Sequence, residues 1–135
     1  MSDTEPHPVS YFQCPEVCRV ALKGFFTIAQ KWQLDDPEMA ILLGCQVQDL
    51  EGLRLNISQI LDTDMLYRIS NLLGIYRELR GLFDAEERAN QWIRKPNSAA
   101  LFQNKSALDY MLNGQLSDIV NVREYLSEAA GHIGL

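Results

Sequence analysis

The side chains here that could perform chemistry are three cysteines, two histidines and a few adjacent carboxylates. Cys14 and Cys18 are four residues apart, which places two thiols on one helix face if Cys14 is helical. Two thiolates supply only half of a tetrahedral zinc site, and neither His7 nor His132 has a ligand-like spacing to them. With Cys45 the count is odd, which favours reduced, buried thiols over a disulfide framework. We therefore expect no metal site.

Two pairs of adjacent carboxylates could supply an acid and a base for catalysis. They are Asp35-Asp36 and Glu86-Glu87, and each pair falls where a helix is expected to begin. Capping of a helix N-terminus and solvation explain acidic residues at such positions. The sequence also contains no glycine-rich phosphate-binding motif. We therefore expect no catalytic residues and no cofactor, in a protein that is not an enzyme and acts by binding.

The size, composition and charge of the chain limit the kinds of partner that it can bind. The 135 residues have a mass of 15.4 kDa, and 47% of them are hydrophobic, as in a globular protein. The apolar stretches are too short to span a membrane and no secretory signal pattern is present, so we expect a cytoplasmic protein without membrane contact. The net charge of −6 disfavours nucleic acid as the main partner, because phosphates repel an acidic chain.

Apolar residues recur at spacings of three and four along most of the chain, which predicts an all-α fold. The first stripe follows Pro15 and consists of Val17, Ala21, Phe25, Ile28 and Trp32. Further helices are expected over residues 37–43, 46–53, 64–83 and 85–93, then two short helices from Ser98 and Ser106, then a final helix carrying Leu116, Ile119, Val120, Tyr125 and Leu126. Residues 57–61 form a short segment before the long helix. Residues 1–14, rich in proline and polar residues, should be a mobile leader.

Local signals predict where several of these helices begin and end. Asp35 or Asp36 can cap the helix that starts near Pro37, and Gly44 can terminate it. Asp84 can cap the helix from Ala85 in the same way. Gly114 is a further stop signal. On the long helix, three arginines are expected at solvent positions: Arg68, Arg77 and Arg80.

The run Ala29-x-x-Trp32-x-Leu34-x-x-x-Glu38-x-x-x-Leu42-Leu43-Gly44 resembles the helix-turn-helix part of Xre-like antitoxins. The resemblance implies that residues 15–62 form a helix-turn-helix lobe, and a homodimer within a larger complex. Gln46, Gln48 and Arg54 are the side chains there that could read promoter DNA, with Asp49 and Glu51 beside them. Direct DNA binding and a purely supporting role for the lobe both remain open.

The C-terminal third resembles the toxin-binding domain of Xre/MbcA/ParS-type antitoxins. The matching residues are Trp92, Pro96, Asn97, Phe102, Ser106, Ala107, Leu108, Asp109, Met111, Leu112, Gly114, Val122, Arg123, Tyr125, Leu126 and Gly131. The chain departs from the family pattern at Asn104, Ser127 and Ala130, where glycine, aspartate and arginine are usual. Asparagine tolerates positive φ, so the turn at residue 104 should survive. The resemblance implies that residues 63–135 form a small helical toxin-binding lobe that shares a core with the first lobe.

The same resemblance implies an antitoxin that occludes the active site of a RES-type toxin, an enzyme that consumes NAD or ADP-ribosylates proteins. Transcriptional autoregulation would accompany that role. The expected toxin contacts are Arg123, Tyr125, Ser127, Ala130, Gly131, His132 and Ile133. Tyr125 could belong to the core instead, and residues 131–135 could be a flexible plug or a frayed end. An alternative function is a stand-alone helix-turn-helix regulator or helical adaptor without a toxin.

Overall fold

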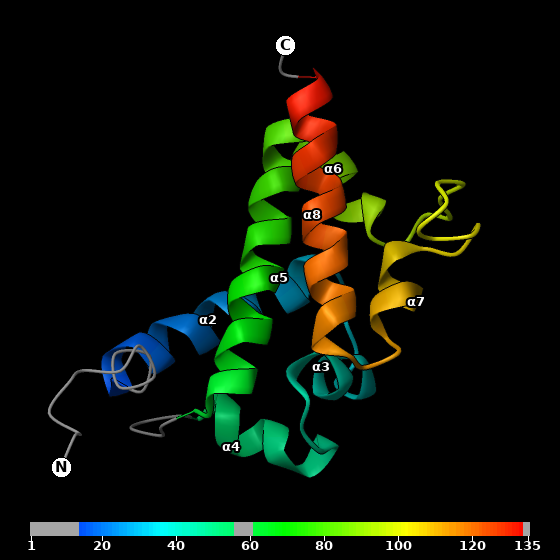
Figure 1. Ribbon diagram of the computed structural model, residues 1–135. Helices are drawn as coiled ribbons and strands as arrows, with labels where there is room; N and C mark the ends of the chain where they lie inside the picture. Colours follow the sequence, from blue (N-terminus) through cyan, green and yellow to red (C-terminus); the bar gives the residue numbers. More distant parts are fainter. Residues whose placement is uncertain (1–13, 56–60, 134–135) are drawn as a thin grey trace, which may run out of the picture.

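The computed structural model describes residues 14–55 and 61–133, with side chains described as far as Gly131 (Figure 1). In chain order the elements are α2 (Pro15–Lys31), α3 (Asp36–Leu43), η1 (Val47–Asp49), α4 (Leu50–Arg54), α5 (Thr63–Leu82), α6 (Glu86–Trp92), α7 (Ala107–Met111) and α8 (Leu116–Ile133). Every regular element in these two ranges is a helix, so the all-α prediction is confirmed. Residues 1–13 of the expected leader and residues 57–60 of the expected short segment lie outside the described residues.

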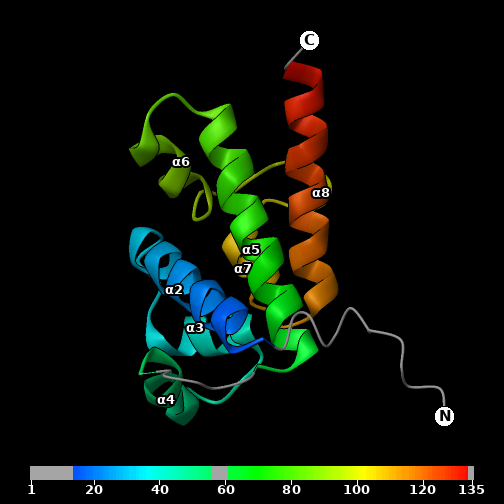
Figure 2. The same cartoon turned by 90° about the vertical axis from the view of Figure 1, so that its left-hand side faces the viewer.

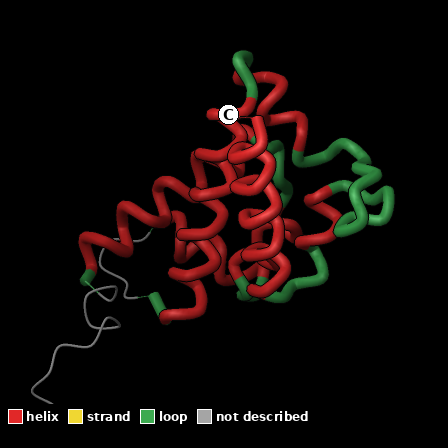
Figure 3. Tube along the Cα trace, turned by 45° about the horizontal axis from the view of Figure 1, so that its top comes forward, coloured by secondary structure: helices red, strands yellow, loops and turns green. Residues whose placement is uncertain are grey.

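Two long helices, α5 and α8, lie side by side and run in the same direction (Figures 1 and 2). The chain returns from the end of α5 to the start of α8 through α6, the long loop seen in Figure 3, and α7. Buried aliphatic residues on both helices form the centre of the core: Ile69, Leu72 and Ile75 on α5, and Ile119, Val122 and Leu126 on α8. Spacings of three and four place each set on one helix face. The shared apolar face therefore fixes α8 against α5.

Helix α3 begins and ends at residues that the sequence predicts. The Asp35 carboxylate accepts a hydrogen bond from the Glu38 backbone N–H at 2.9 Å, and the Glu38 side chain accepts one from the Asp35 N–H at 3.0 Å. This reciprocal capping box satisfies amide groups that the first turn leaves unpaired. Gly44 ends the helix with a φ of 75°, which costs glycine nothing. The expected cap and stop are confirmed. The predicted helix over residues 46–53 is present as η1 followed by α4.

The cap expected at Asp84 is wrong. Helix α6 begins at Glu86, so its N-cap is Ala85, one residue after Asp84. No side chain forms a capping hydrogen bond at that end. Its first turn instead contains Glu86 and Glu87, whose charges favour the positive end of the helix dipole. Dipole stabilisation therefore replaces the expected capping bond.

The short helix expected from Ser98 is also wrong, because residues 98–105 form turns. The Asn97 N–H donates to the Lys105 carbonyl at 3.1 Å, and the Asn104 N–H donates to the Asn97 carbonyl at 2.9 Å. These two bonds pull the ends of the loop together and are incompatible with a helical path. The second expected short helix does form, and Ser106 caps it by accepting a bond from the Asp109 N–H at 3.0 Å.

Arg68 was expected at a solvent position of α5, but it is buried, with 8% of the residue exposed. Its guanidinium donates to the Asp64 carboxylate at 2.7 Å and to the Gly114 carbonyl at 2.9 Å. Longer bonds of 3.3 and 3.4 Å reach the carbonyls of Ile41 and Leu42 at the end of α3. Five donors in a fixed fork allow one arginine to serve partners on several elements. Arg68 therefore joins α3 and α5 to the turn before α8.

Arg94 makes a second connection between the early and late parts of the chain. Its guanidinium donates to the Trp32 carbonyl at 3.0 Å and to the Gln33 carbonyl at 2.7 Å, just past the end of α2. It also pairs with the Glu38 carboxylate at 3.3 Å. A cation at these carbonyls satisfies acceptors that the helix leaves unpaired and complements the helix dipole. The segment after α6 is thereby fixed to the turn between α2 and α3.

Replacing Arg68 with methionine should lower the free energy of unfolding by about 3 kcal/mol, because three backbone carbonyls lose a charged donor. Chemical denaturation followed by circular dichroism measures this change. The matched control is Arg77→Met, since Arg77 is exposed on the same helix and should change stability by no more than about 0.5 kcal/mol. Equal effects of the two substitutions would contradict the role given to Arg68.

Candidate functional site

Two of the predicted contact residues, Arg123 and Ser127, lie one turn apart on α8 and face α5. The Arg123 guanidinium donates to the Asn71 side-chain oxygen at 3.2 Å, and the Ser127 hydroxyl donates to the Glu78 carboxylate at 2.8 Å. Arg123 is half-buried, and its guanidinium lies against the α-carbon of Gly74. Only a glycine leaves this space, because a Cβ at position 74 would collide with the guanidinium. Both side chains therefore line the edge of the α5–α8 interface.

Tyr125 lies in an aromatic cluster, formed by Trp92, Phe102, Tyr110 and Tyr125. Its ring stacks on Trp92 with centroids 6.4 Å apart, and it meets Phe102 edge to face at 5.1 Å. Phe102 also makes edge contacts with Trp92 at 6.0 Å and with Tyr110 at 5.8 Å. Phe102 is fully buried and the other three rings are half-buried. The aromatic cluster therefore joins α6, α7 and α8 and keeps partly exposed rings at its rim.

The solvent-facing side of α8 contains Gly131, which the sequence predicts as a contact, and four residues that it does not predict. Ser117, Glu124, Glu128 and Gly131 are exposed and Asn121 is half-buried, and we name these five residues the α8 ridge. Their spacings of four, three, four and three place them on one face of the helix. The pattern was readable from sequence, because these positions avoid the buried stripe of α8. Glu124 and Glu128 give the ridge a negative charge.

The C-terminal end of α8 contains the remaining predicted contacts. Ala130 is half-buried and Gly131 is exposed. The backbone of α8 continues as helix through Ile133. The side chains of His132 and Ile133, and residues 134–135 as a whole, lie outside the described residues.

The loop before α7 adopts the backbone expected from its unusual asparagine. Asn104 has a φ of 71°, and the preceding Gln103 has a φ of 51°. Asparagine accepts this region more readily than other residues with a Cβ, which confirms that the turn survives without glycine. The loop also carries exposed cations, Lys95 and Lys105, near its two ends.

Of the three DNA-reading candidates, Arg54 has side-chain partners within its own chain. Gln46 and Gln48 are exposed around η1. Arg54 instead pairs with Asp36 at 3.0 Å, and its guanidinium carbon lies 5.4 Å from the centre of the Phe26 ring. A guanidinium engaged by a carboxylate and an aromatic ring of its own chain must leave both partners before it can reach a base. Arg54 therefore differs from the two glutamines, because its guanidinium already contacts Asp36 and Phe26.

Reactive groups are sparse in the part of the chain that is described. Cys14 precedes α2 and is exposed, whereas Cys18 is buried inside it, so the two thiols do not share a helix face. Burial, and secondarily the charge of Asp49, raise the pKa of the Cys45 thiol, which disfavours its nucleophilic thiolate form. Residues 14–55 and 61–133 include no group of three or more potential ligand side chains suited to a metal ion. No helix among them is long and apolar enough to cross a membrane.

An exposed ion pair connects α2 with α6. Lys31 and Glu86 approach to 2.6 Å. The hydrogen bond to Glu86 raises the pKa of Lys31, and the same bond lowers the pKa of Glu86. The Glu86 contribution is therefore present at neutral pH and lost as the pH falls through its lowered value. Full solvent exposure keeps this contribution small.

The region that contains the α8 ridge and the aromatic cluster is similar to a domain of a known protein family. Residues 78–131 match the model of the Xre/MbcA/ParS antitoxin C-terminal toxin-binding domain. A Sinorhizobium fredii protein named "Uncharacterized protein y4oB" is 40% identical over 110 residues, which cover 82% of this chain and 84% of that protein. The chain belongs to the Xre/MbcA/ParS antitoxin family. It therefore has the role of an antitoxin, with a toxin as its protein partner.

The close approach of Arg123 to Gly74 can be tested by comparing how two glycine-to-alanine substitutions in α5 change the free energy of unfolding. Gly74→Ala and Gly81→Ala both replace a glycine within α5, which alone should stabilise the helix by up to about 1 kcal/mol. Gly81 has open space around it, whereas alanine at position 74 must displace the Arg123 guanidinium. Denaturation should therefore show a smaller gain for Gly74→Ala than for Gly81→Ala.

The Arg123→Ala background supplies the control for this comparison. Without the Arg123 guanidinium, Gly74→Ala should increase the free energy of unfolding as much as Gly81→Ala does, because the obstructing group is gone. A difference between the two glycine substitutions that persists without Arg123 would contradict the assigned contact.

Proposed function

We propose that this antitoxin neutralises a RES-type toxin by occluding its NAD cleft with α8. The observation that carries the proposal is the α8 ridge, an exposed helical face inside the matched toxin-binding domain. The opposite face of α8 packs on α5 and holds the helix in place. An occluding helix needs contact area and a fixed position, and it needs no reactive group of its own.

The charge of the α8 ridge supports a nucleotide cleft as its target. NAD carries a negatively charged diphosphate, so a cleft that binds it should present donors and positive charge. Glu124 and Glu128 are exposed carboxylates one turn apart on the ridge. They can meet the same donors and so compete with the dinucleotide for the cleft. An interface of about 1,600 Å² would give a stable complex if a few anchors are fully desolvated.

The predicted contact residues of α8 have three roles within this proposal. Gly131 and the end of the helix enter the cleft together with the ridge, followed by His132 and Ile133. Arg123, Ser127 and Ala130 lie at the edge of the ridge, where Arg123 and Ser127 already have partners on α5. Tyr125 acts through the aromatic cluster by fixing α8 on α6 and α7. Ser127 and Ala130 replace the aspartate and arginine that are usual in the family, so inhibition relies on the other contacts in this proposal.

Charge reversal of the α8 ridge tests the proposal. The double substitution Glu124→Lys and Glu128→Lys should weaken binding to the co-expressed RES-type toxin at least tenfold and abolish growth protection, because two attractive contacts become repulsive. Co-purification and biolayer interferometry measure the loss, and circular dichroism verifies the fold. Glu51→Lys, an exposed reversal on α4, is the matched control and should protect fully. Undiminished protection by the double variant would overturn occlusion by the ridge.

We also propose that a homodimer of the antitoxin, bound to its toxin, contacts its own promoter through the η1 surface. The supporting observation is the exposure of Gln46 and Gln48, two side chains suited to adenine. The net charge of −6 opposes DNA binding by the chain alone, so a basic toxin must contribute positive charge. The alternative is a stand-alone regulator or adaptor, and it requires that no RES-type reading frame lies beside the gene.

A mobility-shift assay at low salt tests the promoter contact. The toxin complex should retard promoter DNA, and Gln48→Ala should weaken that binding by about tenfold through loss of one base contact. Gln103→Ala, an exposed glutamine in the loop before α7, should leave binding unchanged. Equal retardation of the DNA by the wild-type, Gln48→Ala and Gln103→Ala complexes would show that η1 does not read the DNA.

A further inference from the structure

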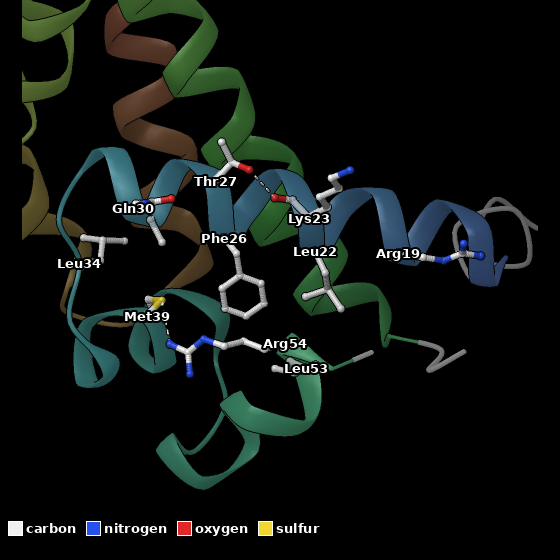
Figure 4. A pocket seen from close by; sticks show the side chains of 11 residues that line it. Arg19, Leu22, Lys23, Phe26, Thr27, Gln30, Leu34, Met39, Leu53 and Arg54 are labelled. Atoms are coloured by element: carbon white, nitrogen blue, oxygen red, sulfur yellow. Dashed lines mark hydrogen bonds between the residues drawn. The ribbon is translucent and has the colours of Figure 1, made fainter. Parts of the chain in front are cut away.

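A groove lies between α2 and the α3–α4 segment, on a part of the chain outside the matched toxin-binding domain (Figure 4). Its volume is about 570 Å³, within the usual range for ligand and peptide sites. Apolar side chains line its floor: Leu22, Phe26, Met39 and Leu53. Phe26 is only half-buried, so part of its ring remains open to an occupant. Leu22, Met39 and Leu53 are buried, so Phe26 is the side chain of this floor that is most open to a peptide segment.

The rim of the groove is cationic. Arg19, Lys23 and Arg54 line it, and all three side chains are exposed. Arg19 pairs with Glu16 at 2.7 Å and Arg54 pairs with Asp36 at 3.0 Å, while Lys23 takes part in none of the ion pairs found in the described residues. Arg54 also covers one face of the Phe26 ring. An apolar floor with a positive rim fits an occupant that combines apolar side chains with carboxylates.

We propose that residues 1–13 of this same chain bind in the groove. This segment contains Asp3 and Glu5 and no lysine or arginine, so its side-chain charge complements the rim. Its apolar side chains are Val9, Tyr11 and Phe12, which can contact the floor. Pro6 and Pro8 restrict the backbone of the free segment and so reduce the entropy lost on binding.

The length of the segment matches the length of the groove. Leu22 lies about 12 Å from Cys14 along α2, and residues 11 and 12 are within about 10 Å of Cys14 along an extended chain, so their aromatic side chains must cover the remaining distance. Residue 9 can reach about 17 Å, well past Leu22 and close to the distance of about 18 Å at which Phe26 lies along α2. Residues 3 and 5 can reach about 30 Å, beyond the positions of Lys23 and Arg54. The apolar residues therefore meet the floor while the carboxylates meet the rim.

The segment is favoured over a second copy of the chain for two reasons. Its attachment at Cys14 gives it a millimolar effective concentration at the groove, which no separate molecule has at ordinary dilution. Two copies joined groove to groove would also bring the Lys23 cations of both copies to one interface, with a repulsive cost.

Nuclear magnetic resonance on the full chain tests this proposal. We expect nuclear Overhauser contacts from the ring protons of Tyr11 and Phe12 to the methyl groups of Leu22 and Leu53. Lys23→Glu should reduce these contacts at least threefold, because a rim cation becomes a repulsive carboxylate. Lys95→Glu, at another exposed lysine far along the chain, is the matched control and should leave them unchanged. Asp3→Asn with Glu5→Gln should reduce them as Lys23→Glu does.

An isotope-filtered experiment on a mixture of labelled and unlabelled protein distinguishes the source of any contact. Contacts that vanish in the filtered spectrum arise within one chain and support the proposal. Contacts that persist in the filtered spectrum would show that a second copy supplies the segment and would overturn it. The absence of any contact between residues 1–13 and the groove in the wild-type spectrum would overturn it as well.

Discussion

The arrangement of this antitoxin depends on one buried cation, the guanidinium of Arg68. It sits where the end of α3, the first half of α5 and the turn before α8 meet, and it donates to a carbonyl or carboxylate of each. A buried cation without partners would be costly, so the surrounding backbone is constrained to supply them. Gly44 belongs to the same constraint, because a Cβ at that position would lie 2.9 Å from the Arg68 Nε atom. The start of α8 is thereby positioned by contacts far from the surface that α8 exposes.

The remaining contacts extend this constraint along the molecule. Arg94 fixes the segment after α6 to the end of α2, and the aromatic cluster fixes α6 and α7 to the middle of α8. Helix α8 is therefore held on two sides, by α5 and by the cluster, and its third side is the ridge. A helix held in this way loses little conformational entropy when a partner binds it. This rigidity is consistent with the proposed binding of α8 in the cleft of a toxin.

The sequence predicted the features that local interactions determine. Most helix positions, the Asp35 cap, the Gly44 stop and the positive φ of Asn104 follow from side chains within a few residues, whereas the helix expected from Ser98 does not form. Arg68 was misplaced because its carbonyl partners lie 26 to 46 residues away in sequence, where no periodicity reveals them. The contact residues on α8 were chosen by resemblance, which did not show that Arg123 and Ser127 turn toward α5. Attention to the face opposite the apolar stripe would have identified Glu124 and Glu128.

Site-specific photo-crosslinking tests most directly whether α8 is the surface that meets the toxin. A photoreactive phenylalanine analogue would replace Glu124 in one sample and Val47, an exposed residue of η1, in another. After irradiation with the RES-type toxin, the account predicts a covalent antitoxin–toxin product from position 124 that maps to the NAD cleft, and none from position 47. A product from position 47 together with none from position 124 would contradict it, because the toxin would then be bound by the opposite end of the molecule.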